Sequence, residues 1–497
     1  MEKSTPIFIF NSLNVMRGGL TKAVIERANT LAEKYNEVTF LTLKYQQNFS
    51  YIKEQLYKTN TLDERVKVVN LFDDIADFQT KKLKSKKREF KVKEKGLIEF
   101  KDDKNELPSY RYYENGLYRK YKRFDKNNNL LFIDYMNENR ERYRRDEYNY
   151  QGFLVRSRHI SSKTNNPVYD QYFDKNGSCF LSIWVNKDKK EYRTLYFKDS
   201  PKEFDDPYEL YTEWVEKKVN SYKNPFVMSD SRFTDKLVLD LKLKHGKKVA
   251  VLHNNHFKKP YDGTNGIKST WETFIENYHK FDNIVFLTEE QKRDIEKITG
   301  EHKKSFVIPH AAKKVNLNNK DYDPYLAVTL ARYDSQKRLD ESINAFSYVV
   351  KEIPEAKYHI YGFGDLKDDL AKQIKELGLE KNIKLKGFSN NPQETYQSAA
   401  CSILTSDYEG FGMVITESLA TGTPVISYDI KYGPKDIIRN NIDGYIVKKG
   451  DQKELASKII NVMKDKELRK RLSQNAPQVL ERFSFENYKN KWFSLLN

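Results

Sequence analysis

The sequence predicts an α/β fold of two doubly wound domains, with an antiparallel β-rich insert inside the first domain. Short apolar runs followed by helical patterns recur in two blocks of the 497-residue chain, which is typical of parallel sheets covered by helices. Residues 81–200 instead lack helical periodicity and carry turn residues at short intervals, as β-hairpins do. A chain of this length also exceeds one ordinary domain.

The first block begins with an apolar run at 6–13, a glycine pair and an amphipathic helical pattern at 20–34. A second apolar run follows at 38–43, and this order of strand, glycine turn, helix and strand opens a parallel sheet. After the insert, the runs at 249–256 and 283–288 are apolar enough for buried strands, and each precedes a helical pattern.

The insert is expected to be an antiparallel meander. Asn115-Gly116 and Asn176-Gly177 separate runs rich in Tyr, Phe, Arg and Val, and Asn-Gly is a strong signal for a tight hairpin. Residues 81–200 hold 30 Lys and Arg against 18 Asp and Glu, a surplus of 12 within a net charge of +17 for the chain. Most of the positive charge therefore lies in this one segment, although lysines that only keep an exposed sheet in solution would give the same count.

The second block repeats the order of apolar run, loop and helix from about residue 321. Its strands are expected within 325–334, 356–365, 382–388, 401–410, 424–430 and 444–447. Sheets of this kind bind ligands in the loops at the carboxyl ends of their strands, so the chemistry is expected there.

These patterns place the domain boundaries. Residues 1–78 and 204–315 form the two parts of the N-terminal domain. Residues 79–203 form the basic insert, and 316–480 form the C-terminal domain. The last helix, within 481–497, is expected to pack back on the N-terminal domain.

Composition excludes several classes of protein. No apolar run approaches the ~18 residues of a membrane span, and the first residues, MEKSTPIFIF, lack the pattern of a secretory signal. The only cysteines, Cys179 and Cys401, are far apart in the chain, which is unlike a disulfide framework or a cysteine zinc site. A cytoplasmic protein is expected, and its pI near 9.2 favours polyanionic partners.

Two pairs of residues are candidates for binding phosphate. Gly18 and Gly19 follow the first strand and open a helix, where the backbone can approach a phosphate closely; a tight turn is the alternative. Arg332 and Lys337 follow the strand that ends near Leu330, and two cations ahead of a helix can clamp a diphosphate. In so basic a chain they could equally be solvated.

The segment SDYEGFGMVITES carries the sharpest pattern. Glu409 lies in a loop after an apolar strand, and Gly410 and Gly412 open the helix that carries Glu417. The glycines would present N–H groups to an anion, and the two carboxylates would accept hydrogen bonds from sugar hydroxyls. The alternative is a turn followed by a solvated helical glutamate.

His253 and His256 lie at the end of an apolar strand. A structural role is more common for such histidines, and a metal is rejected because the sequence places no third ligand. Hydrolysis by a Ser-His-Asp triad is also poorly supported, since no G-x-S-x-G motif is present.

Glu409 to Glu417 read E-G-F-G-x-x-x-x-E, and with Arg332 and Lys337 upstream they resemble the retaining, nucleotide-sugar-dependent glycosyltransferases of family 4, which have the GT-B fold. The resemblance covers everything outside the insert, and it implies that the N-terminal domain is on the acceptor side and that the C-terminal domain, 316–480, binds the nucleotide sugar. More closely, the chain resembles the bacterial wall teichoic acid α-glycosyltransferases of the TagE and TarM type. The segments that carry this likeness are NVMRGGLTKA, LHNNHF, SDYEGFGMVITES and SYDIKYGPKDII.

The resemblance implies a role for each matched residue. Arg332 and Lys337 would hold the diphosphate and stabilise the departing UDP. Glu409 would orient the transferred sugar, Glu417 would bind the ribose, and His253 would lie near C6 of the sugar.

The remaining donor contacts are implied in the same way. The backbone at Gly18 and Gly19 would approach the diphosphate and the acceptor. The backbone of 387–388 would read the uracil. The full donor-binding set comprises Gly18, Gly19, Gly387, Phe388, Gly410, Phe411, Gly412, Met413 and Glu417.

The expected activity is metal-independent transfer of glucose, with retention, from UDP-glucose onto poly(glycerol phosphate) wall teichoic acid. The alternatives are N-acetylglucosamine onto poly(ribitol phosphate), a lipid or protein acceptor, and a GT-B-like scaffold or chaperone subunit without activity. The resemblance also implies a homotrimer through the insert. The charge run at 81–88 could touch the inner face of the membrane, although a solvated linker explains it too, and no nucleic acid is expected because no known binding module is present.

Overall fold

The computed structural model describes residues 4–15, 18–78, 91–315 and 322–496. The chain divides into two compact units. Unit 1 contains Met1–Ser229 and Leu237–Lys247, and unit 2 contains Asp230–Lys236 and Lys248–Asn497. The charge run at 81–88 and the start of the predicted C-terminal domain at 316–321 lie outside the described residues.

Unit 1 contains parallel strands in the order β14-β1-β2-β3, namely Pro225–Ser229, Thr5–Phe10, Val38–Thr42 and Val66–Asn70. Each neighbouring pair is parallel, with Thr5 opposite Pro225 and Ile7 opposite Thr39. The residues of β2 and β14 are all buried, as expected of continuous apolar runs in a parallel sheet. The helices of this part are α1 Gly19–Ala32, α2 Phe49–Lys58, α3 Leu71–Ile75 and α4 Pro207–Val219, and α5 Arg232–Asp240 spans the boundary between the units.

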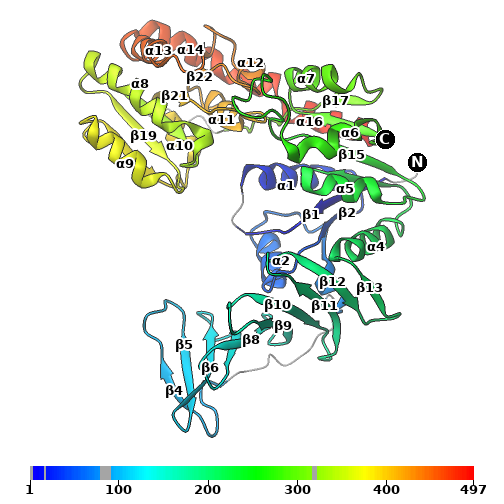
Figure 1. The fold of residues 1–497 in the computed structure, drawn as a ribbon. Helices are drawn as coiled ribbons and strands as arrows, with labels where there is room; N and C mark the ends of the chain where they lie inside the picture. The colour runs from blue at the N-terminus through cyan, green and yellow to red at the C-terminus, as the bar shows by residue number, and fades with distance from the viewer. Residues whose placement is uncertain (1–3, 16–17, 79–90, 316–321, 497) are drawn as a thin grey trace. The chain divides into compact units, whose positions relative to one another are not determined.

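The insert is one ten-stranded antiparallel sheet in which each strand pairs with its neighbour in sequence (Figure 1). Its strands are β4 Ile98–Lys101, β5 Ser109–Glu114, β6 Leu117–Phe124, β7 Leu130–Met136, β8 Arg142–Tyr148, β9 Leu154–Ile160, β10 Pro167–Phe173, β11 Cys179–Val185, β12 Glu191–Tyr196 and β13 Lys202–Phe204. Asn115 and Gly116 form the two-residue connection between β5 and β6 with φ of 48° and 79°, the left-handed values that a type I′ turn requires. The predicted meander is confirmed.

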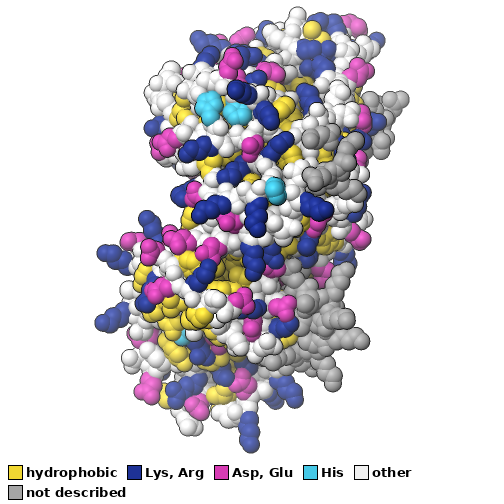
Figure 2. Space-filling view, turned by 90° about the vertical axis from the view of Figure 1, so that its right-hand side faces the viewer, with side chains coloured by type: hydrophobic (Ala, Val, Ile, Leu, Met, Phe, Trp, Pro, Cys, Tyr) yellow, Lys and Arg dark blue, Asp and Glu magenta, His cyan; other side chains and the backbone are white. Residues whose placement is uncertain are grey.

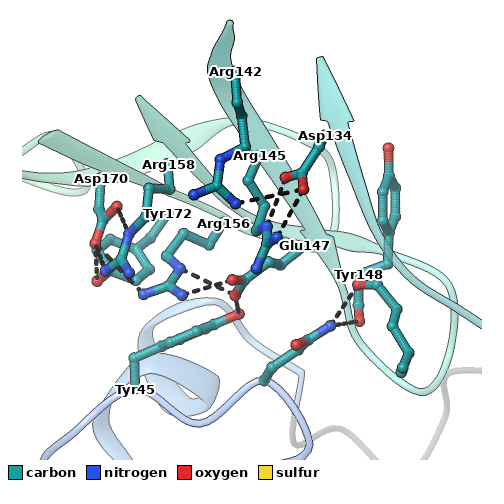
Figure 3. Close-up of polar contacts among 12 residues, drawn as sticks. Tyr45, Asp134, Arg142, Arg145, Glu147, Tyr148, Arg156, Arg158, Asp170 and Tyr172 are labelled. Carbon is teal, nitrogen blue, oxygen red and sulfur yellow. Dashed lines mark hydrogen bonds and ion pairs between the residues drawn. The ribbon is translucent and has the colours of Figure 1, made fainter. Parts of the chain in front are cut away.

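A row of charged side chains crosses four strands of this sheet (Figure 3). Asp134, Arg145, Arg158 and Asp170 are successive register partners on β7, β8, β9 and β10. Arg145 donates two bonds of 2.7 Å to Asp134, and Arg158 donates bonds of 2.8 and 2.7 Å to Asp170. Each guanidinium is thus matched by a carboxylate, which avoids repulsion between the two adjacent arginines.

A second set of polar side chains on the same sheet joins the insert to the rest of unit 1. Arg156 lies opposite Glu147 in the register, and its Nη2 donates to Glu147 Oε1 at 2.7 Å. The hydroxyl of Tyr45, from the segment between β2 and α2, donates to Glu147 Oε2 at 3.0 Å. The guanidinium of Arg156 lies 4.4 Å from the centre of the Tyr45 ring, and burial of this cluster raises the pKa of Tyr45 well above its usual value.

Unit 2 contains two sets of parallel strands. The first is β15 Lys247–Val251, β16 Asn283–Phe286 and β17 Ser305–Val307, paired in this order. The second is a six-stranded sheet in the order β20-β19-β18-β21-β22-β23, namely Ile383–Gly387, Lys357–Tyr361, Asp323–Leu330, Ala399–Leu404, Val425–Tyr428 and Gly444–Val447. Every pair in it is parallel.

The helices of unit 2 are α6 Glu272–Glu276, α7 Glu289–Thr299, α8 Leu339–Glu352, α9 Lys367–Glu376, α10 Pro392–Gln397, α11 Met413–Ala420, α12 Pro434–Ile437, α13 Gln452–Lys464, α14 Lys466–Asn475, α15 Val479–Arg482 and α16 Phe485–Leu495. Helices α8 and α13 pack against each other and share a core with β18, β19 and β22. In the last helix, Lys491 Nζ donates to the carbonyl of Val307 at 3.1 Å. Within the described ranges, no helix combines the length and the apolar character needed to cross a membrane.

The predicted α/β class, with parallel sheets and an antiparallel insert, is therefore confirmed. One element is shorter than expected: the strand predicted at 249–256 ends at Val251. The chain beyond Val251 leaves the sheet, and at Asn255 the side chain accepts a hydrogen bond from Phe257 N and forms a local turn. His253 lies in this segment after the strand.

Removal of one buried carboxylate from the charged row tests its contribution to stability. Asp170 is 2% exposed and pairs with Arg158 and Arg156. Asp170→Ala leaves both guanidiniums without this partner and should lower the free energy of unfolding by about 3–5 kcal/mol, measured by urea denaturation followed by circular dichroism. Asp103→Ala, which removes an exposed partner of Lys101 from the same sheet, should leave the midpoint unchanged. Equal midpoints for the two variants would contradict this account.

Candidate functional site

Two loops at the carboxyl ends of neighbouring strands form the centre of the site. The loop after β18 contains Arg332 and Lys337, and the loop after β21 contains Glu409, as the parallel pairing of β18 and β21 requires. Asp407 N donates to the carbonyl of Gln336 at 2.7 Å, and the Gln336 side chain donates to the carbonyl of Tyr408 at 2.9 Å. The two loops are thus fastened to each other independently of their charged side chains.

Lys337 and Glu409 form a close ion pair at this junction. Lys337 Nζ lies 2.6 Å from Glu409 Oε1, and the two side chains are only 15% and 12% exposed. The buried hydroxyl of Ser406 donates to the same oxygen at 2.7 Å. Glu409 is also fixed by its backbone, since its N–H donates to the carbonyl of Lys431 at 3.1 Å. The carboxylate is therefore held in one orientation through Oε1, which leaves Oε2 to accept from a ligand.

Arg332 shares the loop of Lys337 but differs in environment. Its side chain is 63% exposed, and it pairs with Asp334 at 2.9 Å. Arg338, the next residue after Lys337, adopts a left-handed backbone with φ of 45° and pairs with Glu341 and Asp407. Thr405 Oγ1 donates to the carbonyl of Arg338 at 2.9 Å. These bonds fix the turn that presents Lys337.

The glycines of the 409–417 motif permit close packing of the chain. A Cβ on Gly410 would lie 1.9 Å from the carbonyl oxygen of His253, so only glycine fits there. Gly412 has φ of 90° and is followed by α11, which begins at Met413 and carries the partly buried Glu417 on its second turn. Phe411 between them is buried. The motif therefore brings Glu409 directly beside the loop that contains His253.

His253 is oriented by a carboxylate. Its Nε2 lies 2.7 Å from Asp230 Oδ1, and the two side chains are 8% and 2% exposed. The contact between Nε2 and this carboxylate fixes the orientation of the ring. The ring of His310 is stacked at 5.7 Å from that of His253. His253 is thus a fixed polar group next to the Glu409 loop.

His256, the second histidine of the sequence motif, has a structural environment. It is fully buried, and burial lowers its pKa to about 3, so the ring is neutral. The ring is stacked on Tyr432, whose hydroxyl donates to Asp294 at 3.0 Å. No group of three or more His, Cys, Asp or Glu side chains suited to a metal ion occurs among the described residues.

Gly387 and Phe388 lie at the end of β20, in the same unit. Gly387 has φ of 72°, and its carbonyl accepts a bond from Gly362 N at 2.7 Å. Phe388 is 65% exposed, and its ring lies 6.2 Å from that of Phe363, itself 55% exposed. Two exposed aromatic rings at neighbouring strand ends offer a surface on which a base can stack.

Gly18 and Gly19 belong to unit 1. Gly18 is the N-cap of α1 and Gly19 its first residue, and both are exposed. Their predicted contact with a donor diphosphate stays a prediction.

Several site residues escaped the sequence analysis. Asp230 could have been found, because it follows the apolar run 225–229 at a strand end. Ser406 could also have been found, because it lies three residues before Glu409 in the quoted segment and its hydroxyl donates to that carboxylate. Gln336 and Lys431 carry no comparable signal, since each acts through a contact with a residue distant in sequence or through a backbone atom. Lys431 is in turn anchored by Glu290 and Asp294 on α7.

The sequence matches two family models of glycosyltransferases and is similar to known enzymes. The family described as "Glycosyl transferases group 1" matches residues 311–479, and "Glycosyl transferase 1 domain A" matches residues 7–196. The poly(glycerol-phosphate) alpha-glucosyltransferase of Bacillus subtilis (strain 168) is 30% identical, over 99% of this chain and 74% of that protein. The poly(ribitol-phosphate) alpha-N-acetylglucosaminyltransferase of Staphylococcus aureus (strain COL) is 27% identical, over 98% of both.

The solved structures give the same result. The crystal structure of TarM superposes with a TM-score of 0.88 at 26% identity, over 99% of this chain and 98% of that one. A second structure, of a mutant of S. aureus TarM in complex with fondaparinux, α-GlcNAc-glycerol and UDP, gives a TM-score of 0.85 at 26% identity, over 99% of each chain. The fold and the matching family models thus define a glycosyltransferase of the GT-B type. The chain belongs to the family of teichoic acid α-glycosyltransferases of the TagE and TarM type.

The hydroxyl of Ser406 is expected to matter for turnover because it positions Glu409. Ser406→Ala removes a hydrogen bond to a charged group and should lower kcat about tenfold or more, with a smaller effect on the KM of the donor. Steady-state kinetics of glycosyl transfer measure both. Ser457→Ala, at an exposed position of α13, is the control and should match the unsubstituted protein. An unchanged kcat in Ser406→Ala would show that Glu409 does not depend on this bond.

Proposed function

We propose that the protein transfers a sugar from a UDP-sugar, with retention of the α-configuration, onto a polyol-phosphate polymer. Glucose from UDP-glucose and poly(glycerol phosphate) teichoic acid are the proposed donor and acceptor. The observation that carries the proposal is the fixed Lys337–Glu409–Ser406 cluster in loops at the ends of β18 and β21. The similarity to an enzyme whose name specifies this sugar and this polymer supports it.

Departure of UDP is the step that the cations would assist. An ammonium has three N–H donors, so Lys337 can retain its bond to Glu409 and still donate to a phosphate oxygen. The exposed guanidinium of Arg332 can offer a bidentate fork to the same diphosphate. Because these two cations can balance the charge that develops on the leaving group, we propose a reaction that is independent of metal. Removal of one such donor costs about 10²–10³ in rate.

Retention needs the new bond to form on the face that the phosphate leaves. In the proposed step, the acceptor hydroxyl attacks C1 as the C1–O bond to UDP breaks, and its proton passes to the departing phosphate oxygen. Glu409 is paired with Lys337, so its role is to accept hydrogen bonds from sugar hydroxyls. His253, held by Asp230, would contact the C6 side of the sugar.

The nucleoside would occupy the remaining predicted contacts. Glu417 would bind the ribose, and the backbone of 387–388 would read the uracil beside the exposed Phe388 and Phe363 rings. Gly18 and Gly19 would approach the diphosphate and the acceptor. A cytoplasmic location is proposed because UDP-sugars are made in the cytoplasm, and contact with the inner face of the membrane is a further proposal.

Transfer of N-acetylglucosamine onto poly(ribitol phosphate) is the second candidate. It is favoured by the match to an N-acetylglucosaminyltransferase over 98% of both chains, and by the UDP and α-GlcNAc-glycerol named for the TarM complex. Identities of 30% and 27% are too similar to separate the two sugars.

Release of UDP decides between these candidates. UDP-glucose and UDP-N-acetylglucosamine are each incubated with poly(glycerol phosphate), with poly(ribitol phosphate) and without acceptor. Release that depends on UDP-glucose with poly(glycerol phosphate) is expected, and Lys337→Ala should reduce it about 10²–10³-fold while its circular dichroism spectrum stays unchanged. Release that depends on the other pair would replace the proposed substrates. The absence of any polymer-dependent release would refute the polyol-phosphate acceptor.

A homotrimer through the insert is also proposed. Strand β4 is the terminal strand of the ten-stranded sheet, and it exposes Ile98 and Phe100 by 66% and 54%. An edge strand with exposed apolar side chains can pair with another chain.

On the face shown in Figure 2, Lys and Arg side chains are interspersed with Asp and Glu over the surface, so no single charged patch dominates that view.

The mass in solution tests this assembly. Light scattering should give three times the 58.9 kDa of the chain, and Ile98→Lys with Phe100→Lys should give the monomer. Leu377→Lys, at an exposed apolar position of unit 2, is the matched control and should keep the trimer. A monomeric unsubstituted protein would refute the trimer. A trimer that persists in the doubly substituted variant would show that its interface does not involve Ile98 and Phe100 of β4.

A further inference from the structure

The loop between β15 and α6 is rigidly built although it is exposed. Residues Phe257 and Ile267 form an isolated β-bridge across it, and Lys258 N donates to the carbonyl of Gly266 at 2.9 Å. Asn255 Nδ2 donates to the carbonyl of Tyr261 at 3.1 Å. The shape of this 257–268 loop is therefore fixed by its own hydrogen bonds.

Lys268 closes the loop and lies between two aromatic rings. Its Nζ is 4.2 Å from the centre of the Tyr408 ring and 5.1 Å from that of Tyr261, and these rings are 4.3 Å apart. Its one hydrogen-bond acceptor within the described chain is the carbonyl of Asn255, at 2.8 Å. The ammonium thus has two π-faces and one neutral oxygen around it.

No carboxylate balances this charge among the residues that the structure describes. Burial lowers the pKa of Lys268 to about 8, and no acidic group opposes that shift. Lys431, a partly buried lysine of the same unit, instead pairs with Glu290 and Asp294, and its pKa is raised. Lys337 pairs with Glu409. A partly buried cation without a counter-ion is costly, so an anion from outside the chain is the natural partner.

The position of Lys268 indicates which anion. Tyr408, on which it lies, is followed directly by Glu409, and Asn255, to which it donates, is two residues from His253. The neighbouring Lys449 is already neutralised by Asp407 at 2.9 Å. Arg332, Lys337 and Arg338 are the cations of the loop after β18, and each is paired with a carboxylate. Lys268 lies in the part of the chain that follows β15 and contacts Tyr408, the residue before Glu409, so it is a separate positive group near the same loop.

We propose that Lys268 binds a phosphate of the polyol-phosphate acceptor, the one adjacent to the hydroxyl that receives the sugar. This inference rests on the proposed function and assigns an acceptor subsite to it. A phosphate oxygen would supply the missing negative charge, and Tyr408 and Tyr261 would shield the contact from water. The donor diphosphate offers the same chemistry, so the test must separate the two sources.

Kinetics with and without acceptor make that separation. Lys268→Gln should raise the KM for poly(glycerol phosphate) about 10- to 100-fold, the effect of losing a hydrogen bond to a charged group. It should leave the KM for UDP-glucose unchanged when hydrolysis is measured without acceptor, and it should not affect transfer to glycerol, which carries no phosphate. Lys268→Arg, which keeps the charge, should recover most of the loss. Lys280→Gln, at an exposed position of the same unit, is the control.

Three results would overturn the assignment. An unchanged KM for the polymer would remove Lys268 from the acceptor site. A raised KM for UDP-glucose without acceptor would assign Lys268 to the donor diphosphate. An equal loss with glycerol would show a purely structural role.

A binding measurement without turnover tests the phosphate subsite independently of the proposed glycosyl transfer. Isothermal titration with a glycerol-phosphate oligomer should show binding to the unsubstituted protein and binding about 10- to 100-fold weaker to Lys268→Gln. If transfer fails with both polymers but this difference is found, the proposed reaction is wrong and the phosphate subsite stands. Equal binding by the two proteins, or binding by neither, refutes the subsite.

Discussion

Glu409 is the residue on which the arrangement of the site depends. Its side chain joins Lys337 and Ser406, its backbone N–H is bonded to Lys431, and Lys431 is anchored by acids on α7. A carboxylate fixed from so many sides has lost its rotational freedom before any ligand arrives. That preorganisation is what a transfer reaction requires, since the group need not be ordered again when charge develops on the substrate.

The molecule uses charge in two different ways. In the insert, Arg145 and Arg158 are each matched by a carboxylate of the neighbouring strand, so the row is internally neutral and contributes to stability. At the site, Lys268 has no such match among the described residues, and Arg332 is largely exposed. The surplus of positive charge in the sequence therefore cannot be equated with binding capacity, because much of the arginine content of the insert is already paired.

The sequence was sufficient to predict what depends on local pattern and on parallel topology. The Asn115-Gly116 turn follows from the two residues alone, and the positions of Lys337 and Glu409 in loops after strands follow from the apolar runs that precede them. The adjacency of β18 and β21, which brings the two side chains together, is seen only in the structure. The pairing of His253 with Asp230, and the clash that forbids a side chain at Gly410, depend on the packing of segments far apart in the chain, and composition carries no trace of them.

The position of the insert within the chain also governs how the polypeptide can fold as it is synthesised. Strand β1 pairs with β14, with Thr5 opposite Pro225. This pairing can form only after the whole insert between the two strands has been synthesised. Each strand of the insert, by contrast, meets its partner as soon as the next one has been made. Such local pairing is fast and long-range parallel pairing is slow. The insert can therefore complete its own strand pairing while β1, β2 and β3 still lack β14, the strand that completes their order.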